Sequence, residues 1–218
     1  MPQKEKILKI IEILSKEYPD ARTALDFASP LEMMVATQLS AQCTDKRVNM
    51  VTPALFKKYR TAKDYANADI KKFEQEIRST GFYHNKARNI IGMAKKLVSD
   101  FNGKVPDTME KLITLPGVAR KTANVVLNNT FHKFEGIAVD THVLRLSLRL
   151  GLSSFTDAVK VERDLMEIVP RKYWGKFTYI IVDHGRAICD AKKPKCPECV
   201  ISQYCPSKAA FIRKFWSK

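Results

Sequence analysis

The sequence lacks the signatures of a membrane protein, a β-sheet protein and a repeat protein. No apolar run approaches the roughly 18–20 residues that a helix needs to span a bilayer, and no stretch alternates apolar with polar residues as a half-buried strand does. There is also no low-complexity linker, no internal repeat and no clear break in composition. We therefore expect an all-α globular fold, whose division into domains cannot be derived from the pattern alone.

Acidic residues are scarce. The 218 residues include 38 Lys and Arg but only 23 Asp and Glu, so the formal net charge is +15. An excess of this size favours a polyanionic partner, because a protein that neutralises phosphates releases their condensed counterions. From charge alone, a basic protein without such a partner stays open as the alternative.

Helical spacing of apolar residues and capping signals predict the elements. One apolar stripe begins at Ile7 and ends before Pro19, and Ser29-Pro30-Leu31-Glu32 combines an N-cap, a proline at the first helical position and a capping-box glutamate. A central helix should follow over 31–41. Further helices are predicted near 46–59, 62–66, 70–79, 84–101, 119–130, 141–150, 157–169 and 172–187.

Cysteine is rare except in one segment, where Cys189, Cys196, Cys199 and Cys205 follow the spacing C-x6-C-x2-C-x5-C. The N-terminus is expected to be an amphipathic helix and not a signal peptide, which indicates an intracellular protein. Free or metal-bound cysteines are then more common than disulfides. Four thiols so close in sequence predict a metal site, and their spacing alone leaves zinc and a [4Fe–4S] cluster equally open.

The stretch from 107 to 120 predicts a phosphate-binding hairpin. Asp107-Thr-Met-Glu110 has the spacing of a capping box before a short helix, and Pro116-Gly117-Val118 should form a tight turn. A second helix then opens at Ala119 or Arg120. Such a helix–hairpin–helix aims free backbone N–H groups and the positive end of the second helix at a phosphate oxygen.

Two residues near the hairpin suggest chemistry on a nucleic-acid backbone. Lys121 follows on the first turn of the second helix, and Asp140 lies further on, in Val-Asp-Thr-His. The ordinary interpretations are a solvated lysine and an aspartate that caps a helix. However, a nucleophilic lysine must be neutral, and the positive end of a helix disfavours the charged form.

These residues carry a resemblance to a known family. LPGVxRKTANVV followed by VDTH, together with the 6-2-5 cysteine spacing, closely resembles the endonuclease III family of DNA glycosylase/AP lyases, and the likeness covers essentially the whole chain. The resemblance implies a two-lobed helix–hairpin–helix DNA glycosylase fold with a C-terminal iron–sulfur cluster loop. One six-helix lobe would span 22–132, and 1–21 with 133–218 would form the other. The four cysteines would hold a [4Fe–4S] cluster.

The resemblance also implies the reaction. Lys121 would attack C1′ of an extrahelical oxidised pyrimidine nucleotide in double-stranded DNA, Asp140 would assist, and β-elimination through a Schiff base would cut the strand 3′ to the lesion. We expect a monomer acting on the nucleoid in the cytoplasm of a bacterium or archaeon. Two alternatives remain: a monofunctional thymine or adenine mismatch glycosylase, whose members lack this lysine, and a non-catalytic iron–sulfur module that binds DNA.

Further positions match the DNA contacts of the family. Gln42 corresponds to the glutamine that fills the gap in the duplex, and Phe82 lies where a leucine wedge is common. His142 matches the histidine of VDTH and is expected to be structural more than catalytic. Hairpin contacts are expected from Gly117, Ala119 and Arg120, where Ala119 replaces a glycine and should start a right-handed helix. Candidate backbone or loop contacts are Tyr83, His84, Asn85, Lys86 and Arg88.

Overall fold

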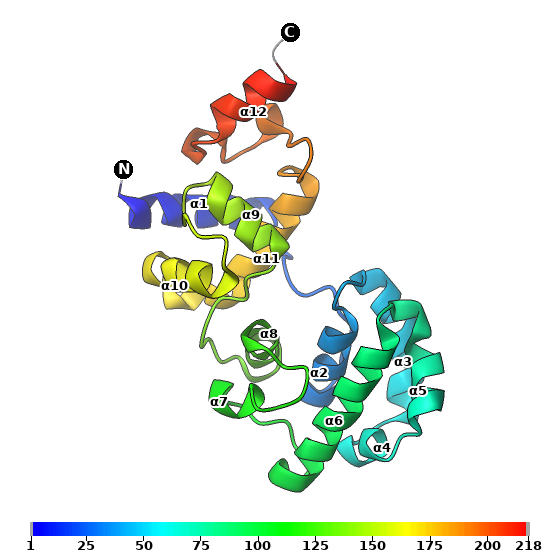
Figure 1. The fold of residues 1–218 in the computed structure, drawn as a ribbon. Helices are drawn as coiled ribbons and strands as arrows, with labels where there is room; N and C mark the ends of the chain where they lie inside the picture. The colour runs from blue at the N-terminus through cyan, green and yellow to red at the C-terminus, as the bar shows by residue number, and fades with distance from the viewer. Residues whose placement is uncertain (1, 217–218) are drawn as a thin grey trace. The chain divides into compact units, whose positions relative to one another are not determined.

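The computed structural model describes residues 2–216, and within these it contains helices and no strand. The chain forms two compact units: Ala24–Glu135, here called the continuous unit, and Met1–Thr23 with Gly136–Lys218, here called the split unit. Figure 1 shows the helices of each unit. No helix among the described residues has the length and apolar character needed to cross a bilayer.

The continuous unit is built around α2 (Pro30–Leu39), a helix in which the side chains from Met33 to Leu39 are all buried. This helix packs against α3, α6 and α8. The apolar surface on all sides of α2 explains its central position in the unit, because a helix can bury every face only when other helices enclose it. The unit comprises α2, α3 (Asp45–Lys58), α4 (Ala62–Ala66), α5 (Ile70–Ile77), the 3₁₀ turn η1 (Arg78–Thr80), α6 (Tyr83–Phe101), α7 (Met109–Leu112) and α8 (Arg120–Phe131).

The split unit joins the two ends of the chain around a second apolar core. The stripe of α1 (Gln3–Glu17) that includes Ile7 and Leu14 is buried against α10 and α11, and α9 packs on α11. The remaining elements are α9 (Thr141–Arg149), α10 (Ala158–Ile168), η2 (Arg171–Tyr173), α11 (Trp174–Ala187), η3 (Cys196–Glu198), η4 (Ser202–Tyr204) and α12 (Lys208–Phe215).

The helices predicted from the sequence are present, and two local details differ. At α7 the predicted capping box is absent: Thr108 is the N-cap without a side-chain bond, and the Asp107 carboxylate instead pairs with Lys133 Nζ at 2.5 Å. At α2, Ser29 Oγ accepts from Glu32 N as predicted, but Glu32 Oε2 accepts from Ala28 N and not from the cap residue. The helix α12 was not predicted from the sequence.

Candidate functional site

The turn between α7 and α8 has a conformation and a packing that only glycine satisfies. Gly117 has φ +73°, and a Cβ there would lie 2.8 Å from Gln38 Oε1 and 2.9 Å from Asn89 Cβ. The Gln38 side chain, buried at the end of α2, donates from Nε2 to Pro116 O at 3.3 Å. The hairpin is thus fixed to the central helix of its unit through close contact with its own backbone.

The second helix opens at Arg120, one of the two predicted starts, but Ala119 does not have the right-handed helical conformation expected for it. It is extended, with φ −87° and ψ 170°, and serves as the N-cap of α8, which begins at Arg120. Alanine adopts this conformation without strain, because φ is negative. Within residues 2–216 the N–H groups of Gly117 and Ala119 donate to no protein acceptor. The exposed turn at the start of a twelve-residue helix is therefore suited to an anion.

Lys121 is exposed on the first turn of α8, immediately beyond the hairpin. The first turn of α8 contains no acidic residue that would neutralise the helix end. An oxygen anion held by the hairpin would thus lie near a lysine amine on the same short segment. Lys121 and the hairpin belong to the continuous unit, whereas Asp140 belongs to the split unit.

Asp140 caps α9 and also contacts the histidine of its own motif. Its Oδ1 accepts from the backbone N–H groups of His142 and Val143, both at 2.8 Å. Its Oδ2 lies 3.0 Å from His142 Nδ1. The His142 ring packs where α9 meets α11, because a Cβ on Gly185 would come within 3.2 Å of its Cδ2. The helix end stabilises the charged carboxylate, and the ring holds its second oxygen in place.

Gln42 and Phe82, the predicted gap-filling residues, share an unusual backbone conformation. Their φ values are +52° and +49°, and both side chains are exposed, Phe82 at 63%. The other non-glycine residues with positive φ in the described chain are Asn102 and His132, which end helices, where this conformation is common. A left-handed non-glycine residue costs on the order of 1–3 kcal/mol and concentrates at functional sites.

The structure corrects the expectation for Lys86. This side chain is 5% exposed, and its Nζ donates to Leu39 O at 2.7 Å and to Thr80 O at 2.8 Å. It therefore faces the interior of the unit and not a DNA backbone. Two other candidates on the same helix turn are exposed and locally paired, His84 with Glu74 at 2.8 Å and Arg88 with Asn85.

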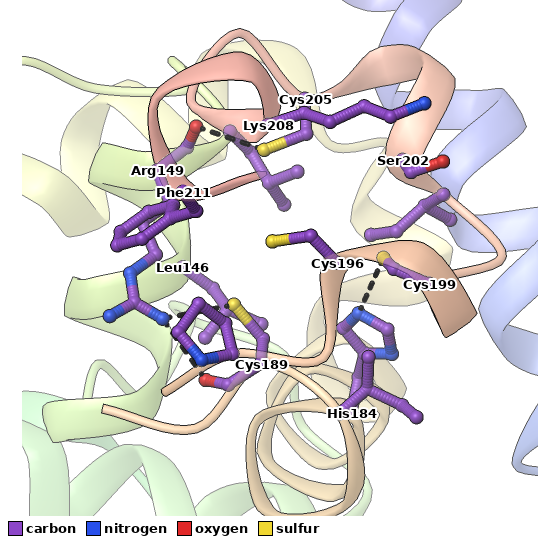
Figure 2. A pocket seen from close by; sticks show the side chains of 14 residues that line it. Leu146, Arg149, His184, Cys189, Cys196, Cys199, Ser202, Cys205, Lys208 and Phe211 are labelled. Carbon is purple, nitrogen blue, oxygen red and sulfur yellow. Dashed lines mark hydrogen bonds between the residues drawn. The ribbon is translucent and has the colours of Figure 1, made fainter. Parts of the chain in front are cut away.

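The four clustered cysteines surround one cavity of the split unit. Figure 2 shows their side chains directed toward a common space, together with Leu146, Arg149, His184 and Phe211. Burial raises the pKa of the Cys199 thiol to about 11, and it also raises the pKa values of Cys196 and Cys205. As thiolates these groups therefore need a cationic centre, which iron or zinc supplies.

The lining of this cavity fits an iron–sulfur cluster. Four cysteine side chains from one segment surround it, and a cluster of four irons accepts one thiolate at each iron.

Two residues that the sequence analysis missed hold this segment. Arg149 donates to Cys189 Sγ at 3.3 Å and to the backbone oxygens of Asp190 and Ala191 at 2.7 and 2.9 Å. His184 Nε2 lies 3.4 Å from Cys199 Sγ, and burial lowers the pKa of this histidine to about 4. No spacing motif marks either residue, because α9 and α11 place them by packing alone.

The fold and these segments agree with known families. A family model for the HhH-GPD superfamily of base excision DNA repair proteins matches residues 35–171, which include the hairpin, Lys121 and Asp140. A second model, the iron–sulfur binding domain of endonuclease III, matches residues 189–205, from the first clustered cysteine to the last. The class is thus a helix–hairpin–helix protein of base excision DNA repair with an iron–sulfur segment.

Individual relatives specify the family. Endonuclease III of Synechocystis sp. is 52% identical over 95% of this chain and 95% of its own length, and that of Bacillus subtilis is 43% identical over 86% of each. A structure of endonuclease III trapped in a covalent DNA intermediate is 42% identical, covers 98% of this chain and 100% of that chain, and superposes with a TM-score of 0.92. This chain belongs to the endonuclease III family. It is a DNA glycosylase/AP lyase of base excision repair, it binds DNA, and its cofactor is a [4Fe–4S] cluster.

Proposed function

We propose that this chain removes oxidised or ring-saturated pyrimidines from double-stranded DNA with Lys121 as its nucleophile. The observation that carries this assignment is the position of Lys121, exposed on the first turn of α8 directly after a turn with unsatisfied N–H groups. A hairpin that binds a DNA phosphate would place that amine beside the deoxyribose of the same strand.

The proposed reaction begins with attack of the neutral Lys121 Nζ on C1′ of a flipped nucleotide. The base leaves with the electrons of the C1′–N bond and takes up a proton. The sugar ring opens to a Schiff base, which acidifies the hydrogen on C2′, so that loss of this proton expels the 3′ phosphate. Asp140, held at the N-terminus of α9, supplies the negative charge that stabilises the developing cation.

DNA binding is assigned to the exposed residues of the continuous unit. Gln42 and Phe82 fill the gap that the flipped nucleotide leaves, and the Phe82 ring stacks on a neighbouring base. The N–H groups of Gly117 and Ala119 bind a phosphate, and Arg120 adds a positive charge at the same helix start. The contact of His142 Nδ1 with Asp140 Oδ2 supports a structural role for this residue, and its place in the motif beside Asp140 supports a position near DNA.

Cys189, Cys196, Cys199 and Cys205 are the proposed ligands of the cluster. When bound, the [4Fe–4S] cluster would link the four cysteines of the segment through iron–thiolate bonds and would supply a redox-active centre. Arg149 and His184 hold the first and third of these sulfurs. The net charge of +15 supports action on nucleoid DNA. The protein is proposed to act there, in the cytoplasm, as a monomer.

Borohydride trapping tests the proposal. One duplex carries thymine glycol and a second carries an abasic site, and Lys121→Ala is compared with Lys95→Ala, which alters an exposed lysine of α6. Covalent adducts on both duplexes, lost only in Lys121→Ala, are expected. An adduct on the abasic site alone would keep the lyase and refute thymine glycol as substrate. Tight binding without any adduct would refute the Schiff base and favour a non-catalytic DNA-binding module.

A further inference from the structure

Lys86 forms a buried bridge between two loops that are far apart in sequence. It lies on the first turn of α6, and its Nζ donates to Leu39 O at 2.7 Å and to Thr80 O at 2.8 Å. The side chain is 5% exposed. The distance between the two carbonyl oxygens therefore cannot exceed the sum of these two hydrogen-bond lengths.

A buried ammonium is costly, and the surroundings offset that cost in a specific way. Leu39 is the last residue of α2, so its carbonyl belongs to the negative end of that helix, where a cation is favoured. Lysine is almost never fully buried unless it is paired. An apolar side chain of similar length would fill the same volume more cheaply, but it would leave two buried carbonyls without a donor.

Each bridged carbonyl lies just before one of the two left-handed residues. Leu39 precedes Gln42 by three positions, and Thr80 precedes Phe82 by two. Turn bonds shape each loop separately, from Cys43 N to Ser40 O at 3.1 Å and from Gly81 N to Arg78 O at 3.2 Å. These bonds fix the local conformation of each loop, whereas the Lys86 bridge fixes the distance between them.

We infer that Lys86 is a positioning residue that sets the spacing of Gln42 and Phe82 and so fits this pair to the gap in the duplex. The inference rests on the gap-filling roles proposed above for those two residues. Lys86 does not touch DNA. It acts through the backbone carbonyls of Leu39 and Thr80, so that the two exposed side chains enter the duplex as one rigid unit instead of two independent loops.

The test compares Lys86→Met, which keeps the length of the stem but removes the donors, with Lys95→Met, an exposed lysine on the same helix. The measurements are single-turnover release of thymine glycol and the fluorescence of 2-aminopurine placed opposite the lesion. We expect Lys86→Met to slow release by about 10- to 100-fold, as displaced positioning groups do. It should also abolish the fluorescence rise on binding, and Lys95→Met should change neither.

A double-mutant cycle separates positioning from a general loss of stability. If Lys86 acts through Gln42 and Phe82, then Lys86→Met causes little further loss in a Gln42→Ala, Phe82→Ala background. Two results would overturn the inference. One is that Lys86→Met slows release as much in this background as it does in the unaltered protein. The other is that Lys86→Met alone keeps the fluorescence rise of the unaltered protein. If Gln42→Ala with Phe82→Ala itself leaves release unchanged, the proposed gap-filling roles are wrong as well.

If Lys86→Met does not fold, Lys86→Arg replaces it in the same cycle. Arginine keeps the charge but changes the geometry of the bridge.

Discussion

Individual residues of this protein often serve two purposes, and the structure allows the two to be separated. Asp140 is an N-cap and also a proposed catalytic carboxylate. Gly117 provides both a turn conformation and the space for Gln38. At Asp140 a substitution can remove one purpose and keep the other, and at Gly117 comparison with a second left-handed glycine separates the two.

Asp140→Asn should inactivate the protein without unfolding α9. Asparagine caps a helix about as well as aspartate, so the free energy of unfolding should change by no more than about 0.5 kcal/mol. Loss of the charge should slow base release by about 100-fold or more. Asp157→Asn is the matched control, because Asp157 caps α10 with the same pair of backbone bonds, to Val159 N and Lys160 N. Thermal unfolding and single-turnover release measure the two effects, and an active Asp140→Asn would leave Asp140 only a capping role.

Gly117→Ala should damage both stability and DNA binding. The left-handed φ costs more than about 1 kcal/mol for alanine, and the contacts with Gln38 and Asn89 force the hairpin to shift. Gly103→Ala provides the comparison, since Gly103 has φ +76° but no atom within 4 Å of an added Cβ. Denaturant unfolding and binding to a duplex with a non-cleavable abasic analogue should show the larger loss at Gly117. Equal losses at the two sites would mean that the close packing of the hairpin contributes nothing.

The residues that the sequence predicted least well are those whose role depends on tertiary contacts. Lys86 was expected to touch DNA, yet it shares the helical face of Ile90, Met93 and Leu97, and that spacing was a readable signal for burial. The left-handed conformations of Gln42 and Phe82 had no such signal. Their side chains were found by resemblance, whereas their strain is visible only in the folded chain.

At the scale of elements, local signals predicted most helices and failed where other contacts take over. The helices predicted over 62–66 and 84–101 are α4 (Ala62–Ala66) and α6 (Tyr83–Phe101), and they have local signals at their ends: a complete capping box at Thr61 and a left-handed C-cap at Asn102. By contrast, η3, η4 and α12 were not predicted. Their conformation depends on partners such as Arg149, whose guanidinium lies 4.6 Å from the centre of the Phe211 ring.

The segment around the cysteines should therefore depend on the cluster for its order. Residues 189–205 contain only two 3₁₀ turns, so few backbone bonds hold them in the absence of the ligated metal. In Cys199→Ser, visible absorbance from the cluster should fall, and hydrogen exchange should accelerate over 189–216. Protection of α2, which is buried on every face in the other unit, should not change. Cys43→Ser is the control, and unaltered exchange over 189–216 in the cluster-free variant would contradict this expectation.

At the scale of the whole molecule, the excess of positive charge should govern how the protein finds DNA. Affinity for an undamaged duplex should fall linearly with salt on logarithmic axes, because phosphate contacts release counterions. If Arg120 contacts a phosphate at the start of α8, then Arg120→Ala should reduce the magnitude of this slope by about 1. Titrations across a range of salt concentrations measure it. An unchanged slope, equal to that of Lys95→Ala, would remove Arg120 from the DNA interface.

The split unit also determines the order in which the protein can form on the ribosome. The apolar stripe of α1 is buried against α11, which ends at Ala187, so α1 is synthesised well before this partner. At synthesis rates of about 5–20 residues per second, the interval between them is roughly ten to thirty seconds. The continuous unit can fold during that time, while Ile7, Ile10, Ile11 and Leu14 stay uncovered. During synthesis the N-terminal helix is thus the surface on which a nascent chain would first require a chaperone.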